Sequence, residues 1–238
     1  MATLVAPRFK TRADDTYFVG ISILMLITVV AGFSRSYFFK GMVLAPLPSL
    51  LLHVHGLAFT SWIVLFVVQT MLVARRNLPL HRTLGWVGSF LAVAMVVLGI
   101  SATIISVHNG RTPPIFTPPM FLALNIYGIL VFGTFVALAV AQRNNRPIHK
   151  RLMLLATLNL MPPATTRFFV FIIHKPALNG PVLLAFTLSL LVFDLVTRRR
   201  PYAVTIIGGV IVATVFPMAN ALGSLPLLKS FAAYVLQQ

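Results

Sequence analysis

Seven long apolar stretches constrain this chain more than any other feature of its sequence. A bilayer core about 30 Å thick is crossed by a helix of about 20 predominantly apolar residues. We expect spans at 17–34, 48–74, 82–107, 119–141, 150–173, 181–197 and 202–222. Charged residues make up only 9% of the chain, whereas soluble domains carry about 25%. The sequence therefore predicts an all-α integral membrane bundle of about seven transmembrane helices, with residues 1–238 forming a single domain.

The distribution of Lys and Arg predicts the orientation of this bundle. Thirteen of them belong to the N-terminal tail, Arg8 included, and to the connections after the second, fourth and sixth spans. The opposite side has five: Arg35, Lys40, Arg111, Lys175 and Lys229. Because cytoplasmic loops are rich in Lys and Arg, we expect a cytoplasmic N-terminus and a place in a bacterial inner membrane.

The same charges identify the expected partners. The net charge of +16 could suggest nucleic acid, but no basic stripe with interleaved aromatic residues follows the chain. Basic residues at the ends of spans instead meet anionic lipid headgroups. We therefore expect membrane lipids as partners and no nucleic acid.

The rare residue types exclude several kinds of site. The chain has no cysteine and three acids, Asp14, Asp15 and Asp194. Thiolate metal sites, covalent c-type haem and cysteine nucleophiles are excluded, as are paired-carboxylate hydrolysis and carboxylate-rich di-metal sites. Imidazole is then nearly the only side chain that could hold a metal ion or haem. No catalytic residues are assigned, and whether the protein is an enzyme stays open.

The six histidines divide into two groups along the membrane normal. His53 and His81 flank the second span and are 28 residues apart, which is about 42 Å along a helix. They cannot share a ligand. The outer group consists of His53, His55, His108 and His174, and the inner pair consists of His81 and His149.

We predict a metal site in the outer group, because two to four imidazoles at one level suit copper, zinc or haem iron. His53 and His55 could bind one ion only if the chain around them is extended, since residues two apart on a helix point about 200° apart. In a helix, the small residues beside His53 would admit a flat macrocycle or a neighbouring helix. The alternative is that these histidines are hydrogen-bonded surface groups.

The inner pair belongs to a repeat offset by 68 residues, in which 77–82 (Asn-Leu-Pro-Leu-His-Arg) matches 145–150 (Asn-Arg-Pro-Ile-His-Lys). We expect each Asn to cap a helix and each Pro to occupy its first turn. His81 and His149 would then project from the opening turns of two outgoing helices and bind a cofactor, haem b or a metal ion. The alternative is interfacial anchoring, in which Arg82, Lys150 and Arg151 hold lipid phosphates.

Two further predictions concern charged residues in the later spans. Arg167 lies inside the fifth span, just after Pro162-Pro163, which should kink or break that helix. It is a candidate to pair with a haem propionate, a quinone carbonyl or an anionic substrate, or else to reach a lipid headgroup. Asp194 lies four residues before Arg198, which is the spacing of a helical ion pair.

The motifs also carry a resemblance. They are His53-x-His55-Gly56, Leu80-His81-Arg82-x-Leu84-Gly85-Trp86 and His149-Lys150-Arg151-Leu152-Met153. This set resembles an uncharacterised bacterial family of multi-pass membrane proteins over about 51–167. A more distant likeness is to diheme b-type membrane cytochromes, which implies haems held by histidines at opposite membrane faces.

Together these patterns predict a multi-pass membrane protein with a histidine-based haem or copper site, in membrane redox chemistry, electron transfer or metal handling. Other membrane redox subunits would be its partners. The alternative is a transporter, or a lipid-interacting or accessory scaffold subunit with no bound cofactor. We also expect the C-terminal tail, 225–238, to form a short interfacial helix.

Overall fold

The computed structural model describes residues 9–39 and 49–237. Arg8, Lys40 and residue 48, which entered the predictions above, lie outside these residues. Within the described ranges the regular secondary structure is entirely helical and contains no strand. The predicted all-α membrane bundle is thereby confirmed.

Six helices of the described chain are long and apolar enough to cross a membrane. They are α1 (Phe9–Phe33), α3 (Leu50–Ala74), α4 (Leu78–His108), α5 (Pro118–Ala141), α8 (Asn179–Arg198) and α9 (Ala203–Gly223). The shorter elements are η1 (Ser34–Phe38), α6 (Arg146–Asn159), α7 (Pro162–Arg167), η2 (Phe168–Ile172), η3 (Pro176–Leu178) and α10 (Pro226–Gln237). These positions match the predicted spans closely, except that the fifth is not one continuous helix.

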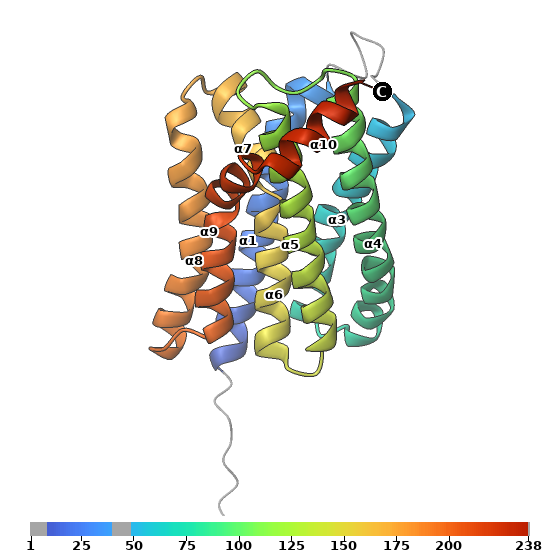
Figure 1. Ribbon diagram of the computed structural model, residues 1–238. Coiled ribbons are helices and arrows are strands. Elements are labelled where there is room, and N and C mark those ends of the chain that lie inside the picture. Colours follow the sequence, from blue (N-terminus) through green and yellow to red (C-terminus); the bar gives the residue numbers. More distant parts are fainter. Residues whose placement is uncertain (1–8, 40–48, 238) are drawn as a thin grey trace, which may run out of the picture.

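The fifth span is broken at Pro162-Pro163, as predicted. α6 ends at Asn159, and α7 restarts at Pro162 and leads into the π-helical turn η2. Proline lacks the N–H that would continue the hydrogen-bond ladder, and its ring clashes with the preceding turn. Figure 1 shows α6 and α7 following one another from one end of the bundle towards the other.

The two ends of the bundle differ in their basic residues. The start of α1 lies at the same end as the α3–α4, α5–α6 and α8–α9 connections (Figure 1). We call this the basic end, because it carries most of the Lys and Arg residues that the sequence analysis assigned to the cytoplasmic side. The C-terminal helix α10 lies across the opposite end (Figure 1), and its presence confirms the helix predicted for the tail.

The two copies of the repeat begin their helices differently. Pro occupies the first turn of both α4 and α6, as expected. The side chain of Asn77 accepts a hydrogen bond from the N–H of Leu80 at 3.3 Å, whereas the side chain of Asn145 makes no such bond. The predicted cap is thus confirmed for α4 and wrong for α6. The main-chain oxygen of Asn145 accepts hydrogen bonds from the N–H groups of Ile148 and His149.

The bundle is closely packed inside and apolar outside. Side chains such as Phe132, Met95 and Leu155 are completely buried between the helices. On α4, by contrast, Trp86 and Phe90 are exposed. In a membrane such outward apolar side chains face lipid, so they fit the hydrophobic surface that a spanning bundle requires.

Candidate metal centre

The structure brings His81 and His149 together at the basic end of the bundle. His81 projects from the first turn of α4, and His149 projects from the first turn of α6. Their ring centres lie 6.4 Å apart, and the ring planes are nearly perpendicular at 89°. The repeat therefore places its two imidazoles beside each other, although they are 68 residues apart in the chain.

The main chain of α5 orients His149. The Nδ1 atom of this ring lies 2.8 Å from the carbonyl oxygen of Ala139, so the Nδ1–H group donates to that oxygen. The proton is then on Nδ1, and the lone pair of a neutral ring is on Nε2. Histidines that bind metals commonly have their second nitrogen held in this way by a backbone carbonyl.

His81 has an unsatisfied nitrogen. Its Nδ1 atom is buried and has no hydrogen-bond partner within the described residues. Buried polar atoms in folded proteins are nearly always hydrogen-bonded, so this unpaired nitrogen is a candidate ligand atom.

Gln69 of α3 adds a second unsatisfied atom close to His81. Its Nε2 atom donates to the main-chain oxygen of His81 at 3.2 Å, while its Oε1 atom is buried and unpaired. Gln69 could not be selected from the sequence, because a single glutamine in an apolar helix has no motif to identify it. The only signal was its polarity within an apolar span.

The small residues that follow His81 pack against α3. A Cβ atom added to Gly88 would lie 3.1 Å from Leu65, and one added to Gly85 would lie 3.8 Å from the Gln69 amide nitrogen. The face of α4 beside His81 is therefore covered by protein. This packing gives no slot for a flat macrocycle along these glycines.

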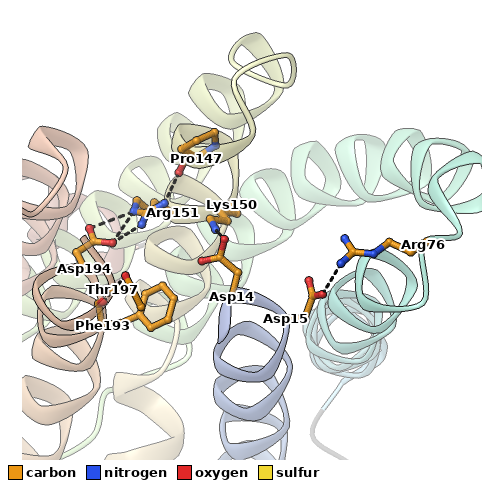
Figure 2. Close-up of polar contacts among 9 residues, drawn as sticks. All are labelled: Asp14, Asp15, Arg76, Pro147, Lys150, Arg151, Phe193, Asp194 and Thr197. Atoms are coloured by element: carbon orange, nitrogen blue, oxygen red, sulfur yellow. Dashed lines mark hydrogen bonds and ion pairs between the residues drawn. The ribbon is translucent and has the colours of Figure 1, made fainter. Parts of the chain in front are cut away.

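All three acids of the chain are in ion pairs with basic residues of other elements (Figure 2). Asp14 of α1 pairs with Lys150 at 2.7 Å, and Asp15 pairs with Arg76, just after α3, at 2.9 Å. The third acid, Asp194, pairs with Arg151. Lys150 and Arg151 directly follow His149, so these pairs fix the first turn of α6 against α1 and α8.

The alternative in which Lys150 and Arg151 hold lipid phosphates is therefore wrong for Arg151, which is 1% exposed. The predicted pairing of Asp194 with Arg198 is also wrong. Asp194 is fully buried and accepts hydrogen bonds from Arg151 and from the Thr205 hydroxyl at 2.6 Å. Arg198 instead stacks on the ring of Tyr202 at 3.6 Å. The spacing of residues along α8 could not reveal that Asp194 pairs with Arg151 of α6.

The outer histidines do not form a comparable group. His53 and His55 both lie within α3, so the extended start that would let them share an ion is not present. His53 Nδ1 lies 3.4 Å from the hydroxyl of Tyr37, and His55 stacks on Phe59 with ring centres 4.2 Å apart. A Cβ atom on Gly56 would lie 2.8 Å from the Tyr37 ring, so an aromatic side chain occupies the small surface beside His53.

His108 and His174 have separate environments. His108 Nδ1–H donates to the main-chain oxygen of Val235 in α10 at 3.2 Å, and His174 is exposed with a left-handed backbone conformation, φ 55°. In residues 9–39 and 49–237, no three His, Asp or Glu side chains form a group that could hold a metal ion. The structure thus does not gather the four predicted outer ligands into one site.

Arg167 lies far from the inner pair. It is the last residue of α7, whereas His149 lies in the first turn of α6, and these two helices follow one another from one end of the bundle towards the other (Figure 1). Its guanidinium donates to the main-chain oxygen of Pro163 at 3.0 Å and stacks over the ring of Phe33 at 4.6 Å. Arg167 therefore does not share a site with His81 and His149.

Comparisons with protein-family models, with curated proteins and with solved structures found no match for this chain.

Proposed function

We propose that this multi-pass membrane protein binds a transition-metal ion, copper, between His81 and His149, and that it serves membrane redox chemistry or metal handling. The observation that carries the proposal is the approach of these two imidazoles at the basic end of the bundle. Imidazole is a ligand that copper binds well, and the chain has no cysteine and no unpaired carboxylate among its described residues to compete with it.

The separation of the rings fits a shared ion. A ring nitrogen lies about 1.2 Å from its ring centre, so two nitrogens each about 2.0 Å from one ion hold the centres about 5–6.5 Å apart. The 6.4 Å between His81 and His149 is within this range, near its linear limit. His149 would ligate through Nε2 and His81 through its unpaired Nδ1 atom. The Gln69 Oε1 atom would be a third donor, through oxygen.

A single ion fits the surroundings better than haem b does, because Gly85 and Gly88 pack against α3. When bound, copper supplies one-electron transfer or is itself the cargo. The chain's own contribution is orientation. The Ala139 carbonyl fixes the proton of His149, and the ion pairs of Lys150 and Arg151 hold the first turn of α6 in place.

The proposal is tested by purifying the protein in a mild detergent, loading it with copper and measuring both metal content and the absorption spectrum. We expect about one copper ion per chain, with loss of binding in His81→Ala and in His149→Ala. His174→Ala is the matched control, because it removes an exposed imidazole that is not one of the two proposed ligands. This variant should retain the metal.

Other outcomes decide between the alternatives. A Soret band that disappears in the same two variants would indicate haem in place of copper. Equal copper content in wild type, His81→Ala and His149→Ala would contradict the proposed site. A folded protein that binds neither metal nor haem would favour the transporter or the accessory scaffold.

A further inference from the structure

The C-terminal helix α10 bounds an apolar cavity at the end of the bundle opposite the proposed metal centre. This helix packs against α4, α5 and α9, and Figure 1 shows it lying across α5. The cavity has a volume of about 170 Å³. α5 forms most of its wall, and Leu222 of α9 and Leu228 of α10 complete it. Because protein interiors contain few voids larger than a water molecule, a cavity of this size suggests an occupant.

The cavity follows α5 through one half of the membrane. Leu122, Ile126 and Leu130 all line it, and side chains four residues apart share one face of a helix. Leu122 is completely buried, whereas Leu130 is 48% exposed, so the cavity extends from the interior to the lipid-facing surface. From Leu122 to Leu130 the helix rises about 12 Å. This is most of the depth that one leaflet contributes to a bilayer core about 30 Å thick.

The wall of the cavity fits a hydrocarbon chain and not water. Apart from Tyr127, every side chain that lines it is aliphatic. A buried water molecule needs several polar partners, and apolar cavities without them stay dry. An acyl chain needs no hydrogen bond, and it gains dispersion contacts with each side chain of the wall. A lipid chain is therefore the occupant that the lining favours.

A positive charge lies next to this cavity. Lys229 directly follows Leu228 and is exposed. All three acids of the chain pair with other basic residues, so no acidic side chain neutralises Lys229. A lysine in an interfacial helix attracts the phosphate of a lipid headgroup. An anionic headgroup fits better than a zwitterionic one, because the ammonium group of the latter would find no acidic side chain here.

We propose that the cavity between α5, α9 and α10 binds one acyl chain of an anionic phospholipid, whose phosphate pairs with Lys229. The orientation of α10 supports this placement. Leu227 and Tyr234 are 80% and 60% exposed, and their spacing of seven residues puts them on one face of the helix. Such an exposed apolar face is expected for a helix that lies in the headgroup region. The bound lipid would then help to hold α10 against α5 and α9.

Native mass spectrometry of the full-length, delipidated protein in detergent tests the proposal. The protein is titrated with phosphatidylglycerol, and separately with phosphatidylcholine that carries the same acyl chains. We expect one tightly bound phosphatidylglycerol per chain. Phosphatidylcholine should bind about fivefold more weakly, which is the effect of one basic residue at a membrane surface.

Two matched pairs of variants test the acyl chain and the headgroup separately. Leu130 and Leu138 are both 48% exposed on α5, but Leu138 does not line the cavity. Leu130→Trp should weaken the binding of both lipids by about fivefold or more, because its ring fills space that the chain needs. Leu138→Trp should leave binding unchanged. Lys229→Gln should remove the preference for phosphatidylglycerol, whereas Lys175→Gln, which changes an exposed lysine assigned to the same side of the membrane, should retain it.

The proposal is overturned if the wild type binds the two lipids equally, or if Leu130→Trp and Leu138→Trp have the same effect. It is also overturned if Lys229→Gln keeps the preference. Lipid-free dimers that Leu130→Trp converts to monomers would show that a second copy of the chain covers the cavity instead. Copper binding at His81 and His149 is measured independently, so either proposal can fail without the other.

Discussion

Arg151 of α6 and Asp194 of α8 form an ion pair that is almost completely removed from solvent, with exposed fractions of 1% and 0%. The aspartate also accepts hydrogen bonds from Thr205 and from the N–H of Tyr202, and the Arg151 guanidinium stacks on the Tyr202 ring at 3.9 Å. Three helices, α6, α8 and α9, are thereby joined at the basic end. The pair lies two residues from His149, so it holds the helix that carries half of the proposed metal centre.

Removing one partner of this pair should strongly destabilise the bundle. Asp194→Asn leaves the Arg151 charge buried without a counter-charge, a change that costs about 3–5 kcal/mol. Arg76→Ala is the control, because it breaks the exposed pair with Asp15 and should cost no more than about 1 kcal/mol. Thermal unfolding in detergent measures both. Similar midpoints for the two variants would show that the buried pair does not have this role.

The packing of α1 against α7 predicts a difference between two glycines of the same helix. A Cβ atom on Gly32 would lie 2.2 Å from the main-chain oxygen of Ala164, whereas one on Gly20 would meet nothing within 4 Å. Gly32→Ala should therefore destabilise the protein by about 1–3 kcal/mol through overpacking. Gly20→Ala should be neutral or stabilising by up to about 1 kcal/mol, because alanine favours helix. Equal unfolding midpoints would argue against close contact between α1 and α7.

The bond from His108 to Val235 predicts how the C-terminal helix is held. Val235 is near the end of α10, where carbonyl groups lack partners within the helix. His108→Ala should remove about 1 kcal/mol of local stability and speed amide exchange in α10 by roughly fivefold. His174→Ala should leave exchange in α10 unchanged. Exchange in α10 that does not respond to His108→Ala would contradict the role assigned to this bond.

The charge asymmetry predicts which end of the bundle faces the cytoplasm. Because the chain has no cysteine, single cysteines can be introduced without a background signal. Asn144→Cys lies in the α5–α6 connection, and Ser224→Cys follows α9 at the other end. A membrane-impermeant thiol reagent added to intact cells should label Ser224→Cys and not Asn144→Cys. The reverse pattern would invert the predicted orientation.

Periodicity and composition predicted the helices well, because long apolar runs and proline positions act locally on the chain. The break at Pro162-Pro163 and the C-terminal helix were both found in this way. The partner of Asp194 could not be predicted in this way, because Arg151 is 43 residues away in the sequence and only tertiary packing decides the pairing. Gln69 was missed because a single glutamine within an apolar span belongs to no motif. Helix length alone assigned His81 and His149 to the opposite end of the bundle from the other histidines. The repeat indicated that these two histidines occupy equivalent positions in two helices.

The most direct test of the metal centre is X-ray absorption at the copper edge of the loaded, detergent-purified protein. We expect two imidazole nitrogens about 2.0 Å from the ion, and one fewer in either His81→Ala or His149→Ala if copper is still bound. An imidazole count that is the same in the wild type and in both variants would contradict it.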